Sequence, residues 1–574
     1  MITWRPAAAS EIAFIAFVSQ TMRSTMNKRF YITTAIDYVN GQPHLGHAYE
    51  KIIADVIARA QRSLGQEVFF LTGLDEHGQK VQQAAQAEKK DPQAYCDALA
   101  ADWLAFAKKL ELTNDDFVRT TQPRHKEFVQ ATLSKLNDAG HFYKATYTGF
   151  YSTREETFLT EKDRRPDGTF DPAYGEVVEL KEDNYYFKLG AHQQWLIDYI
   201  EKNPSFIQPD YRRNEVLGFL RNSKLEDLCI SRPASRLNWG IPLPFDKNFV
   251  TYVWFDALVN YISIPAARGD RGSGLGSSVS SPGETRDPKL QAPEANLWPA
   301  DIHVIGKDIL KFHAVYWPIM LKAMDLPLPK QILVHGWWQK DGAKISKSTG
   351  NIVDPIAVID EWGLDAFRFY VLRELDIGPD GNWTDAGFRA RYSAELANGL
   401  GNLVNRSLSM LKRYRNGIVP PKSDELAADA TKAADETRAL LRQNQLQAAL
   451  QSIWALVTRA NQYVDQTAPF KLAKDPAQAK RLDEVLYNLA ETCRILAVLL
   501  SPFLPATSAK IYAQLGLPGT PGQLSDATWG KLTAGHTISD PAPLFPRRDD
   551  VEQQIKKTVQ KADDRKTTTG LTGI

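Results

Sequence analysis

The order of apolar and polar positions near the N-terminus predicts an alternation of strand and helix. Residues 30–36 are β-branched and apolar, which is typical of a buried parallel strand. A turn at residues 40–43 follows, then a helical period over residues 45–64 and a second strand at residues 68–71. Strand, helix and strand joined by short turns predict the first half of a doubly wound α/β sheet with a Rossmann-like, nucleotide-binding topology.

The pattern changes twice further along the chain. Residues 149–249 carry short aromatic strands and polar turns and predict an inserted α+β connective subdomain. Strand patterns return at residues 252–254, 302–305 and 332–335, and we assign them to the second half of the parallel sheet. Residues 385–515 have a helical period with breaks at 416–421 and 475–476, which predicts an antiparallel helix bundle.

These patterns divide the chain into seven segments. An N-terminal extension (1–27) resembles either an organelle transit peptide or the product of an upstream start codon, and we favour Met26 as the working start. A Gly-, Ser- and Pro-rich stretch at 267–290 predicts a flexible surface insertion. The remaining segments are the two catalytic halves (28–148 and 250–340), the connective subdomain (149–249), a linking segment (341–387), a helical domain (388–545) and a charged tail (546–574).

Composition narrows the class of protein only slightly. The 574 residues exceed one compact core, so several domains are expected. A net charge of +1 neither supports nor excludes a nucleic-acid partner, since a neutral enzyme can carry a local basic track. Cys96, Cys229 and Cys493 are far apart, which excludes a disulfide framework and favours a reducing, cytoplasmic location. An organelle remains the alternative if residues 1–27 are a transit peptide. No apolar run approaches the roughly 20 residues that span a bilayer.

A histidine pair lies where the first strand passes into its helix. His44, Gly46 and His47 belong to the sequence Pro-His-Leu-Gly-His, and both histidines fall on one face of the helix start. A helix N-terminus favours anions, and imidazoles there can donate to the phosphates of ATP. Gly46 leaves room for an adenine ring close to the backbone. Taken alone, the motif is equally compatible with two surface histidines.

A second motif contains Lys344, Ser346, Lys347 and Ser348 in the sequence Lys-Ile-Ser-Lys-Ser. Two ammonium groups in a glycine-flanked loop can neutralise the leaving pyrophosphate, and a loop that opens can release it. By itself, such a segment is more often an exposed basic loop than a catalytic one.

Together, in this order and context, the two motifs resemble the signatures of the class I aminoacyl-tRNA synthetases. Residues 31–34, 72–78, 252–257 and 306–309 resemble the methionyl-tRNA synthetases in particular, and the likeness runs from about residue 28 to 548. It implies a ligase that activates methionine with ATP and Mg²⁺ and transfers it to tRNA(Met), including the initiator tRNA. It also assigns His44, His47, Lys344 and Lys347 to catalysis, and the named residues of both motifs to ATP binding.

The resemblance further implies a methionine pocket. Asp75 would pair with the substrate ammonium, aromatic rings suit a thioether, and Tyr261 or His313 could offer the sulfur a polar contact. Asp37 departs from the family, which usually has an apolar or aromatic residue there. The positions that match the family's methionine-binding residues are Ile36, Tyr38, Asp75, Trp254, Ala257, Tyr261, Ile309 and His313.

Two more implications concern metal and tRNA. Residues 151–156 hold no cysteine where many family members carry the first zinc-binding pair, so we expect neither structural zinc nor another metal site. Asn402, Arg406 and Phe470 match the family's anticodon-reading residues, with Phe in place of the usual Trp. Unpaired bases are recognised by stacking on aromatic rings and by bonds to their exposed edges. The extra C-terminal domain of dimeric members does not follow the helical domain, so we expect a monomer with no membrane partner.

Three other functions share some of these features. Another class I synthetase would share both motifs, although the short insert argues against the isoleucine, valine and leucine enzymes. An adenylyltransferase acting on a small molecule would share the histidine motif but has no use for an anticodon-like helical domain. A non-catalytic tRNA-binding paralogue would be expected to have lost His44, His47 or Lys347, and all three are present.

Overall fold

The protein folds into two compact units. The computed structural model describes residues 29–39, 41–152, 157–159, 161–269, 297–344 and 353–547. Of these, the first unit holds the residues up to 338 with the short segments 353–356 and 377–381. The second unit holds residues 339–344, 357–376 and 382–547.

Within the described residues, the first unit is built on one sheet of seven parallel strands. Their order is β2-β3-β1-β13-β14-β8, and β4 also pairs with β3. This arrangement confirms the predicted Rossmann-like sheet, including the strands predicted at 302–305 and 332–335. The strands are β1 (Phe30–Thr34), β2 (Asp37–Tyr38), β3 (Val68–Asp75), β4 (Asp116–Arg119), β8 (Ile207–Gln208), β13 (Ile302–Gly306) and β14 (Gln331–His335).

Strand β2 continues β1 along the same side of β3, but with a shifted register. Thr33 of β1 is the partner of Leu71, whereas Asp37 of β2 is the partner of Leu74. Four steps along β1 and β2 therefore match only three steps along β3, so the chain contains one extra residue at this junction. An extra residue reverses the alternation of side chains between the two faces of a sheet. The faces of Asp37 and Tyr38 are set by this shift.

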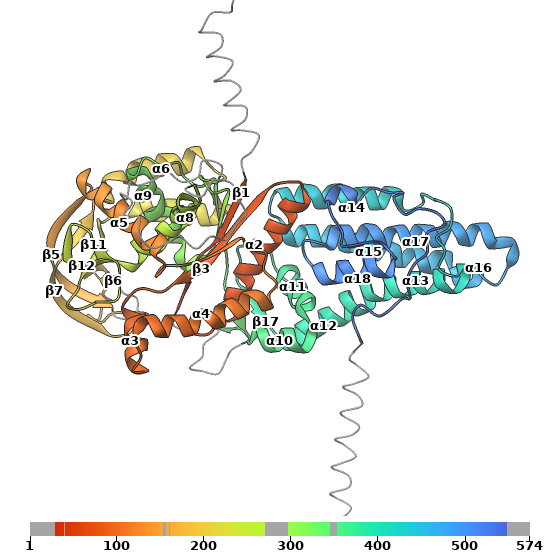
Figure 1. The fold of residues 1–574 in the computed structure, drawn as a ribbon, viewed down its shortest axis with the longest axis horizontal. Helices are drawn as coiled ribbons and strands as arrows, with labels where there is room; N and C mark the ends of the chain where they lie inside the picture. The colour runs from red at the N-terminus through yellow and green to blue at the C-terminus, as the bar shows by residue number, and fades with distance from the viewer. Residues whose placement is uncertain are drawn as a thin grey trace, which may run out of the picture. The chain divides into compact units, whose positions relative to one another are not determined.

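The helix α2 (Leu45–Ser63) connects β1 and β2 to β3 and agrees with the helix predicted over residues 45–64. Its buried residues include Leu45, Ile52 and Val56, which repeat at helical spacing, and it packs on β1, β3 and β13 (Figure 1). The other helices of the first unit are α3 (Gln79–Ala87), α4 (Pro92–Lys109), α5 (Pro123–Asp138), α6 (Gln193–Lys202), α7 (Asp210–Asn222), α8 (Val253–Gly269) and α9 (Trp317–Ala323).

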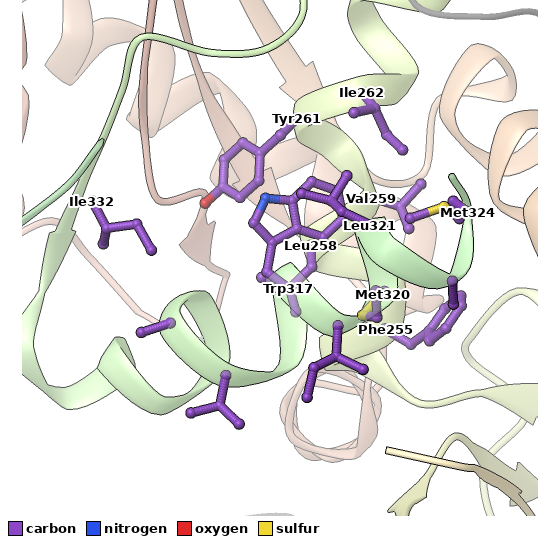
Figure 2. Close-up of a cluster of buried hydrophobic side chains, with 14 of the residues drawn as sticks. Phe255, Leu258, Val259, Tyr261, Ile262, Trp317, Met320, Leu321, Met324 and Ile332 are labelled. Atoms are coloured by element: carbon purple, nitrogen blue, oxygen red, sulfur yellow. The ribbon is translucent and has the colours of Figure 1, made fainter. Parts of the chain in front are cut away.

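The main hydrophobic core lies between the sheet and helices α5, α8 and α9. Tyr31 and Phe69 of the sheet belong to this core, and the Tyr31 hydroxyl donates to the backbone carbonyl of Tyr261 at 2.9 Å. Odd-numbered residues of β3 before Gly73 therefore face α8, and even-numbered ones face α2. Figure 2 shows how residues of α8 interleave with those of α9 and the turn after it, namely Phe255, Leu258, Val259, Tyr261 and Ile262 with Trp317, Met320, Leu321 and Met324.

Three smaller sheets accompany the parallel sheet among the described residues. Two of them lie mainly within the range predicted for the connective segment, but β8, inside the same range, pairs with β14 of the parallel sheet because Ile207 is buried in the main core. The strands of the three smaller sheets are β5 (Phe142–Ser152), β6 (Thr157–Leu159), β7 (Val177–Phe187) and β9 (Leu228–Cys229); β10 (Ser231–Pro233), β11 (Pro242–Leu243) and β12 (Asp246–Thr251); and β15 (Trp338–Lys340), β16 (Ala343–Lys344) and β17 (Gly381–Trp383).

One predicted strand is wrong. Residues 252–254 were assigned to the parallel sheet, but the strand there is β12, which ends at Thr251 and belongs to an antiparallel sheet. Helix α8 begins at Val253. Val253, Phe255 and Leu258 are all buried, so this helix is covered on nearly all sides. Such a helix has no amphipathic period that would distinguish it from a buried strand.

The second unit is helical, as predicted for residues 385–515. The predicted breaks at 416–421 and 475–476 fall between helices. A π-helical segment (Tyr392–Gly401) runs directly into α13. The helices are α10 (Pro355–Trp362), α11 (Leu364–Arg373), α12 (Asp385–Arg391), α13 (Asn402–Arg415), α14 (Ala427–Arg442), α15 (Leu446–Thr467), α16 (Pro469–Leu472), α17 (Ala479–Leu500) and α18 (Pro505–Gln514).

Several predicted segments lie wholly or partly outside the described residues. These are the N-terminal extension, most of the predicted insertion at 267–290, and the tail from residue 548. Helix α8 extends to Gly269, so the first three residues of the predicted insertion are helical. Across the part of the chain that the structure describes, no helix combines the length and apolar character needed to cross a bilayer.

Candidate active site

The two histidines of the first motif cap helix α2. His44 is the N-cap residue, and its Nδ1 accepts from the backbone N–H of Gly46 at 3.1 Å. His47 occupies the third helical position, and its Nδ1 accepts from the backbone N–H of His44 at 3.2 Å. The two rings stack with their centroids 3.7 Å apart. The pair forms a capping box in which imidazoles replace the usual hydroxyl and carboxylate.

This capping arrangement fixes the tautomer of both rings. Because each Nδ1 accepts a hydrogen bond, each neutral ring carries its hydrogen on Nε2. Two Nε2–H donors therefore lie at the positive end of a helix dipole, which is a favourable site for a polyanion. Gly46 also leaves room for the His44 ring, because a Cβ at this position would lie 3.0 Å from His44 Cε1 and the ring would have to shift.

The second motif lies mostly outside the described residues. Lys344 ends β16, and its backbone pairs with Gln339 of β15 across a turn formed by Asp341 and Gly342. Both turn residues have positive φ, 51° and 77°, which is the conformation of a tight hairpin turn. Ser346, Lys347 and Ser348 lie outside the described residues.

Asp75 and Tyr38 lie side by side at the carboxyl end of the parallel sheet. They are register partners on β3 and β2, so their side chains share a face. The alternation along β3 places Asp75 on the side of helix α8. Asp75 is only 6% exposed. In open α/β sheets, ligands bind at this edge, where parallel strands end.

Three further predicted residues lie on one face of helix α8. Trp254, Ala257 and Tyr261 are spaced by three and four residues, so they lie one above another. Trp254 stacks on Phe312 with the centroids 3.7 Å apart and the planes within 7° of parallel. Burial raises the pKa of Tyr261 well above its ordinary value, and the nearby charges of Glu50, Asp37 and Asp75 raise it further.

His313 is buried beside Tyr261 in a π-helical turn (Phe312–Tyr316), a feature often found at functional sites. His313 Nδ1 lies 3.0 Å from the carbonyl oxygen of Ile309, and an acceptor of this kind fixes the hydrogen on Nδ1. The Tyr261 hydroxyl therefore donates to His313 Nε2, at 2.7 Å. Burial lowers the pKa of His313 to about 4, so the ring is neutral at physiological pH. Ile309 and Ile36 are partly buried against the same core.

A buried carboxylate that the sequence did not single out ties these elements together. Asp256, in the first turn of α8, accepts from His77 Nδ1 and His125 Nε2, each at 2.6 Å. His77 belongs to the loop after Asp75, and His125 to helix α5. Although burial opposes ionisation, the two histidines hold the pKa of Asp256 at about 2. The polar run Asp-Glu-His at the end of a buried strand was the sequence signal that could have indicated this network.

Sequence reasoning also missed a second polar cluster, on the opposite face of the sheet. Lys51 is 4% exposed, and its Nζ lies 3.0 Å from Asp37 Oδ1 and 2.9 Å from Glu50 Oε1. His335, which ends β14, lies with Nε2 3.3 Å from Glu50 Oε2. No motif signals this cluster, because its members come from β2, α2 and β14.

The three predicted anticodon-reading residues belong to the helical unit. Asn402 begins α13, and Arg406 lies one turn later with Nη2 3.4 Å from Asp465 Oδ1 of α15. Phe470 is the second residue of α16, and this helix directly follows Ala468, which has a left-handed conformation (φ 44°). The Phe470 side chain is 45% exposed. The left-handed turn ends α15 and redirects the chain so that an aromatic ring faces solvent.

Aromatic and charged side chains stabilise the connective segment around residues 147–159. Tyr151 is buried beneath the guanidinium of Arg236, 4.6 Å from its ring centroid, and Arg236 also pairs with Glu182 at 2.8 Å. The Tyr147 hydroxyl lies 2.8 Å from the carbonyl oxygen of Leu159. Among the described residues, no three His, Cys, Asp or Glu side chains are arranged to hold a metal ion.

Comparisons with known proteins agree with this arrangement. Two family models match, described as "tRNA synthetases class I (M)" over residues 30–176 and 171–408, and "Anticodon binding domain of methionyl tRNA ligase" over residues 415–562. The methionine–tRNA ligase of Bacillus subtilis is 42% identical over 92% of this chain and 79% of its own length, and that of Rhizobium meliloti is 42% identical over 90% and 98%. A solved Mycobacterium tuberculosis methionyl-tRNA synthetase in complex with methionyl-adenylate has a TM-score of 0.80 at 36% identity, with 91% of this chain and 100% of that chain covered.

A Rossmann-like sheet whose first crossover helix is capped by two histidines, followed by a helical anticodon-binding domain, defines a class I aminoacyl-tRNA synthetase. The identity of more than 40% to methionine–tRNA ligases over nine-tenths of the chain then identifies the amino acid. The chain belongs to the methionyl-tRNA synthetase family, and its reaction is the ATP-dependent ligation of methionine to tRNA.

Proposed function

We propose that methionine is activated at the carboxyl edge of the parallel sheet, with its ammonium group on Asp75 and its side chain between Ile36, Trp254 and Tyr261. The observation that carries this proposal is the convergence on that edge of the Tyr38–Asp75 register pair with one face of α8. Ala257 leaves space between the two aromatic residues of that face. Ile309 and His313 line the end of the pocket near Tyr261, where the thioether sulfur would lie.

The chemistry we propose needs no protein nucleophile. The methionine carboxylate attacks the α-phosphorus of ATP, forming methionyl-adenylate and breaking the bond to pyrophosphate. The terminal ribose hydroxyl of tRNA then attacks the methionyl carbonyl and displaces AMP. The Nε2–H groups of His44 and His47 stabilise the charge that develops on the phosphates during the first step.

The lysine-rich motif supplies the remaining positive charge in this proposal. Lys344 and Lys347 neutralise the departing pyrophosphate, Ser346 and Ser348 donate to its oxygens, and Gly46 keeps the backbone of α2 accessible to the nucleotide. Mg²⁺ enters with ATP on the phosphate oxygens, since it prefers oxygen ligands and retains much of its own water.

Substitution of Asp75 by Asn tests the pocket. The change is nearly isosteric and removes the charge that pairs with the ammonium, so kcat/KM for methionine in ATP–pyrophosphate exchange should fall about 100-fold, while KM for ATP changes little. Asp97→Asn is the control, because Asp97 is a half-exposed carboxylate that pairs with Arg119 in the same unit. Exchange that is equally fast in the Asp75 variant and the control would refute the assignment.

We further propose that Asn402, Arg406 and Phe470 read the CAU anticodon of tRNA(Met), initiator tRNA included. Supporting this role are the placement of Asn402 and Arg406 on one face of α13 and the exposure of the Phe470 ring. A splayed base can stack on that ring, while the amide and guanidinium bond the exposed edges of its neighbours.

The enzyme is also proposed to be a monomer without structural zinc. The packing of Tyr151 beneath Arg236, and the ion pair of Arg236 with Glu182, support a connective segment that is stabilised without metal. Elemental analysis of the purified enzyme should find less than about one zinc per ten chains, and light scattering should give the mass of one chain, 64.4 kDa. Stoichiometric zinc or twice that mass would contradict the respective point.

A further inference from the structure

The residue between two pocket residues, Ile36 and Tyr38, has its side chain on the opposite face of the sheet. Asp37 pairs in register with Leu74, so the two side chains share a face of the sheet. Side chains alternate along β3, and this alternation places Leu74 on the side of helix α2. The extra residue at the junction of β1 and β2 produces this orientation: without it, Asp37 would share the face of Tyr31, on the α8 side. The same shift directs Tyr38 to the face of Asp75.

Lys51 of α2 makes three hydrogen bonds, and two of them hold this segment. Its Nζ lies 3.0 Å from Asp37 Oδ1, 3.0 Å from the carbonyl oxygen of Ala35 and 2.9 Å from Glu50 Oε1. An ammonium group has three hydrogens, and each has an acceptor here. Two of the acceptors, Ala35 and Asp37, flank Ile36. Lys51 therefore holds the backbone carbonyl of the residue before a predicted methionine contact and the side chain of the residue after it.

The cluster is buried, so its charges interact strongly. Asp37, Glu50 and Lys51 are 7%, 7% and 4% exposed. Burial and the charge of Glu50 together raise the pKa of Asp37 to about 7, although Lys51 opposes them. Although burial opposes it, the charges of Lys51 and His335 lower the pKa of Glu50. A substitution that removes one partner leaves a buried charge uncompensated, which is costly in a medium that solvates charge poorly.

Lys51 also lies on the helix face that begins at the histidine pair. His44, His47 and Lys51 are separated by three and four residues, so they line one side of α2. The helix that carries the proposed phosphate donors is thereby joined, one turn below them, to the segment that carries Ile36 and Tyr38.

We propose that Asp37 and Lys51 are a positioning pair for amino-acid activation, which holds the Ile36–Tyr38 segment in the methionine pocket against the helix of His44 and His47. The proposal rests on the assignment of the pocket made above. Neither residue touches the substrate; each acts through the backbone of the segment. Asp37, which departs from the family pattern, thus has Lys51 as its partner. Their ion pair takes the place of the packing that an apolar or aromatic residue would provide at position 37.

Single and double substitutions of the pair test it. In ATP–pyrophosphate exchange, Asp37→Asn should raise KM for methionine about tenfold, with KM for ATP within twofold of the unaltered enzyme. Lys51→Gln should raise it more, because two buried carboxylates then face each other without a cation. In the double variant D37N/K51Q, two amides can hydrogen-bond to each other, so KM for methionine should return to within about threefold of its original value.

Asp55 provides the matched control. Asp55 lies one turn beyond Lys51 on the same helix, is fully buried, and pairs with Arg59 at 2.7 Å and with the backbone N–H of Thr113 at 2.8 Å. Asp55→Asn should lower the melting temperature and leave KM for methionine unchanged. If Asp37→Asn behaves in the same way, the pair is structural only and the proposal fails. It also fails if the double variant is no better than Lys51→Gln. Should Lys51→Gln be insoluble, the comparison of Asp37→Asn with Asp55→Asn decides alone.

The Asp75→Asn enzyme distinguishes failure of the positioning pair from failure of the proposed methionine pocket. If Asp75→Asn raises KM for methionine and Asp37→Asn does not, the pocket stands and the positioning pair is wrong. If Asp75→Asn leaves KM for methionine unchanged while Asp37→Asn raises it, the pair positions a methionine site, but that site is not the one assigned to Asp75.

Discussion

At the scale of single residues, recognition of a thioether in the proposed methionine pocket depends on the hydrogen of the Tyr261 hydroxyl. Because the Ile309 carbonyl fixes the hydrogen of His313 on Nδ1, His313 Nε2 accepts the hydrogen of Tyr261. A thioether sulfur is a weak acceptor with no hydrogen to donate. The hydroxyl of Tyr261 can turn from His313 to the sulfur, whereas the methylene of norleucine offers it nothing.

Substitution of Tyr261 by Phe should therefore reduce selectivity more than it reduces binding. We expect kcat/KM for methionine to fall about tenfold and that for norleucine to change less than threefold, since a hydrogen bond contributes on the order of 1 kcal/mol. ATP–pyrophosphate exchange with both amino acids measures this ratio. Tyr31→Phe is the control, because its hydroxyl donates to the Tyr261 carbonyl in the same core without facing the pocket. An unchanged methionine-to-norleucine ratio in the Tyr261 variant would show that the hydroxyl does not sense the sulfur.

At the scale of elements, Asp256 joins three parts of the first unit. It lies in the first turn of α8, which carries Trp254 and Tyr261, and it binds His77 in the loop after β3 and His125 in α5. The folded-state pKa of about 2 lies below the ordinary value of 3.8. The ionised carboxylate is therefore favoured by folding, and its contribution to stability is present above pH 4 and is lost as the pH falls toward 2.

Substitution of Asp256 by Asn should lower the free energy of unfolding at pH 7 by on the order of 2 kcal/mol. The difference between the two enzymes should shrink between pH 4 and pH 3, because the unaltered enzyme loses the same contribution there. Urea unfolding across that range measures both quantities. Asp97→Asn, which breaks a half-exposed pair with Arg119, should cost less than about 1 kcal/mol. A difference that is independent of pH would mean that Asp256 stabilises α8 by shape alone.

Elements with a local periodic pattern of buried residues could be predicted from the sequence. Elements and contacts that depend on tertiary burial or on strand register could not. Helix α2 has one buried face and one defined start, so its bounds were predicted within a residue. The start of α8 was predicted as a strand. Val253 and Phe255 are both buried by tertiary packing, so this part of the helix has no polar face that would show a helical period in the sequence. Asp37 and Lys51 are fourteen positions apart on different elements, and their contact also requires the register shift between β1 and β2.

At the scale of the whole molecule, most of the residues proposed for methionine activation and all of those proposed for anticodon reading belong to different compact units, although Lys344 belongs to the second. His44, Asp75 and Tyr261 lie in the first unit, and Asn402, Arg406 and Phe470 in the second. The residues proposed for both sites could be predicted from their resemblance to the family. The tautomers of the histidines and the buried networks behind them required the structure, since hydrogen bonds between distant segments leave no periodic signal in a sequence.

This division predicts that the two half-reactions respond separately to a change at Phe470. Phe470→Ala removes an exposed ring from α16 and should lower kcat/KM for charging of tRNA(Met) by about 10- to 100-fold, since base stacking contributes about 1–3 kcal/mol. ATP–pyrophosphate exchange without tRNA should be unchanged. Phe470→Trp should charge tRNA(Met) at least as well as the unaltered enzyme, because the larger ring offers more stacking area.

The control for this prediction is Ile418→Ala, which also removes an exposed apolar side chain from the second unit. It should alter neither half-reaction. If Phe470→Ala slows exchange as much as charging, the ring stabilises the fold instead of reading a base. If it slows neither, the anticodon is read without it, and Asn402 and Arg406 alone would have to carry the recognition of CAU. Transcripts with altered anticodons then separate the two cases: loss of a stacking contact weakens charging of every transcript alike, whereas loss of an edge contact narrows the gap between CAU and the others.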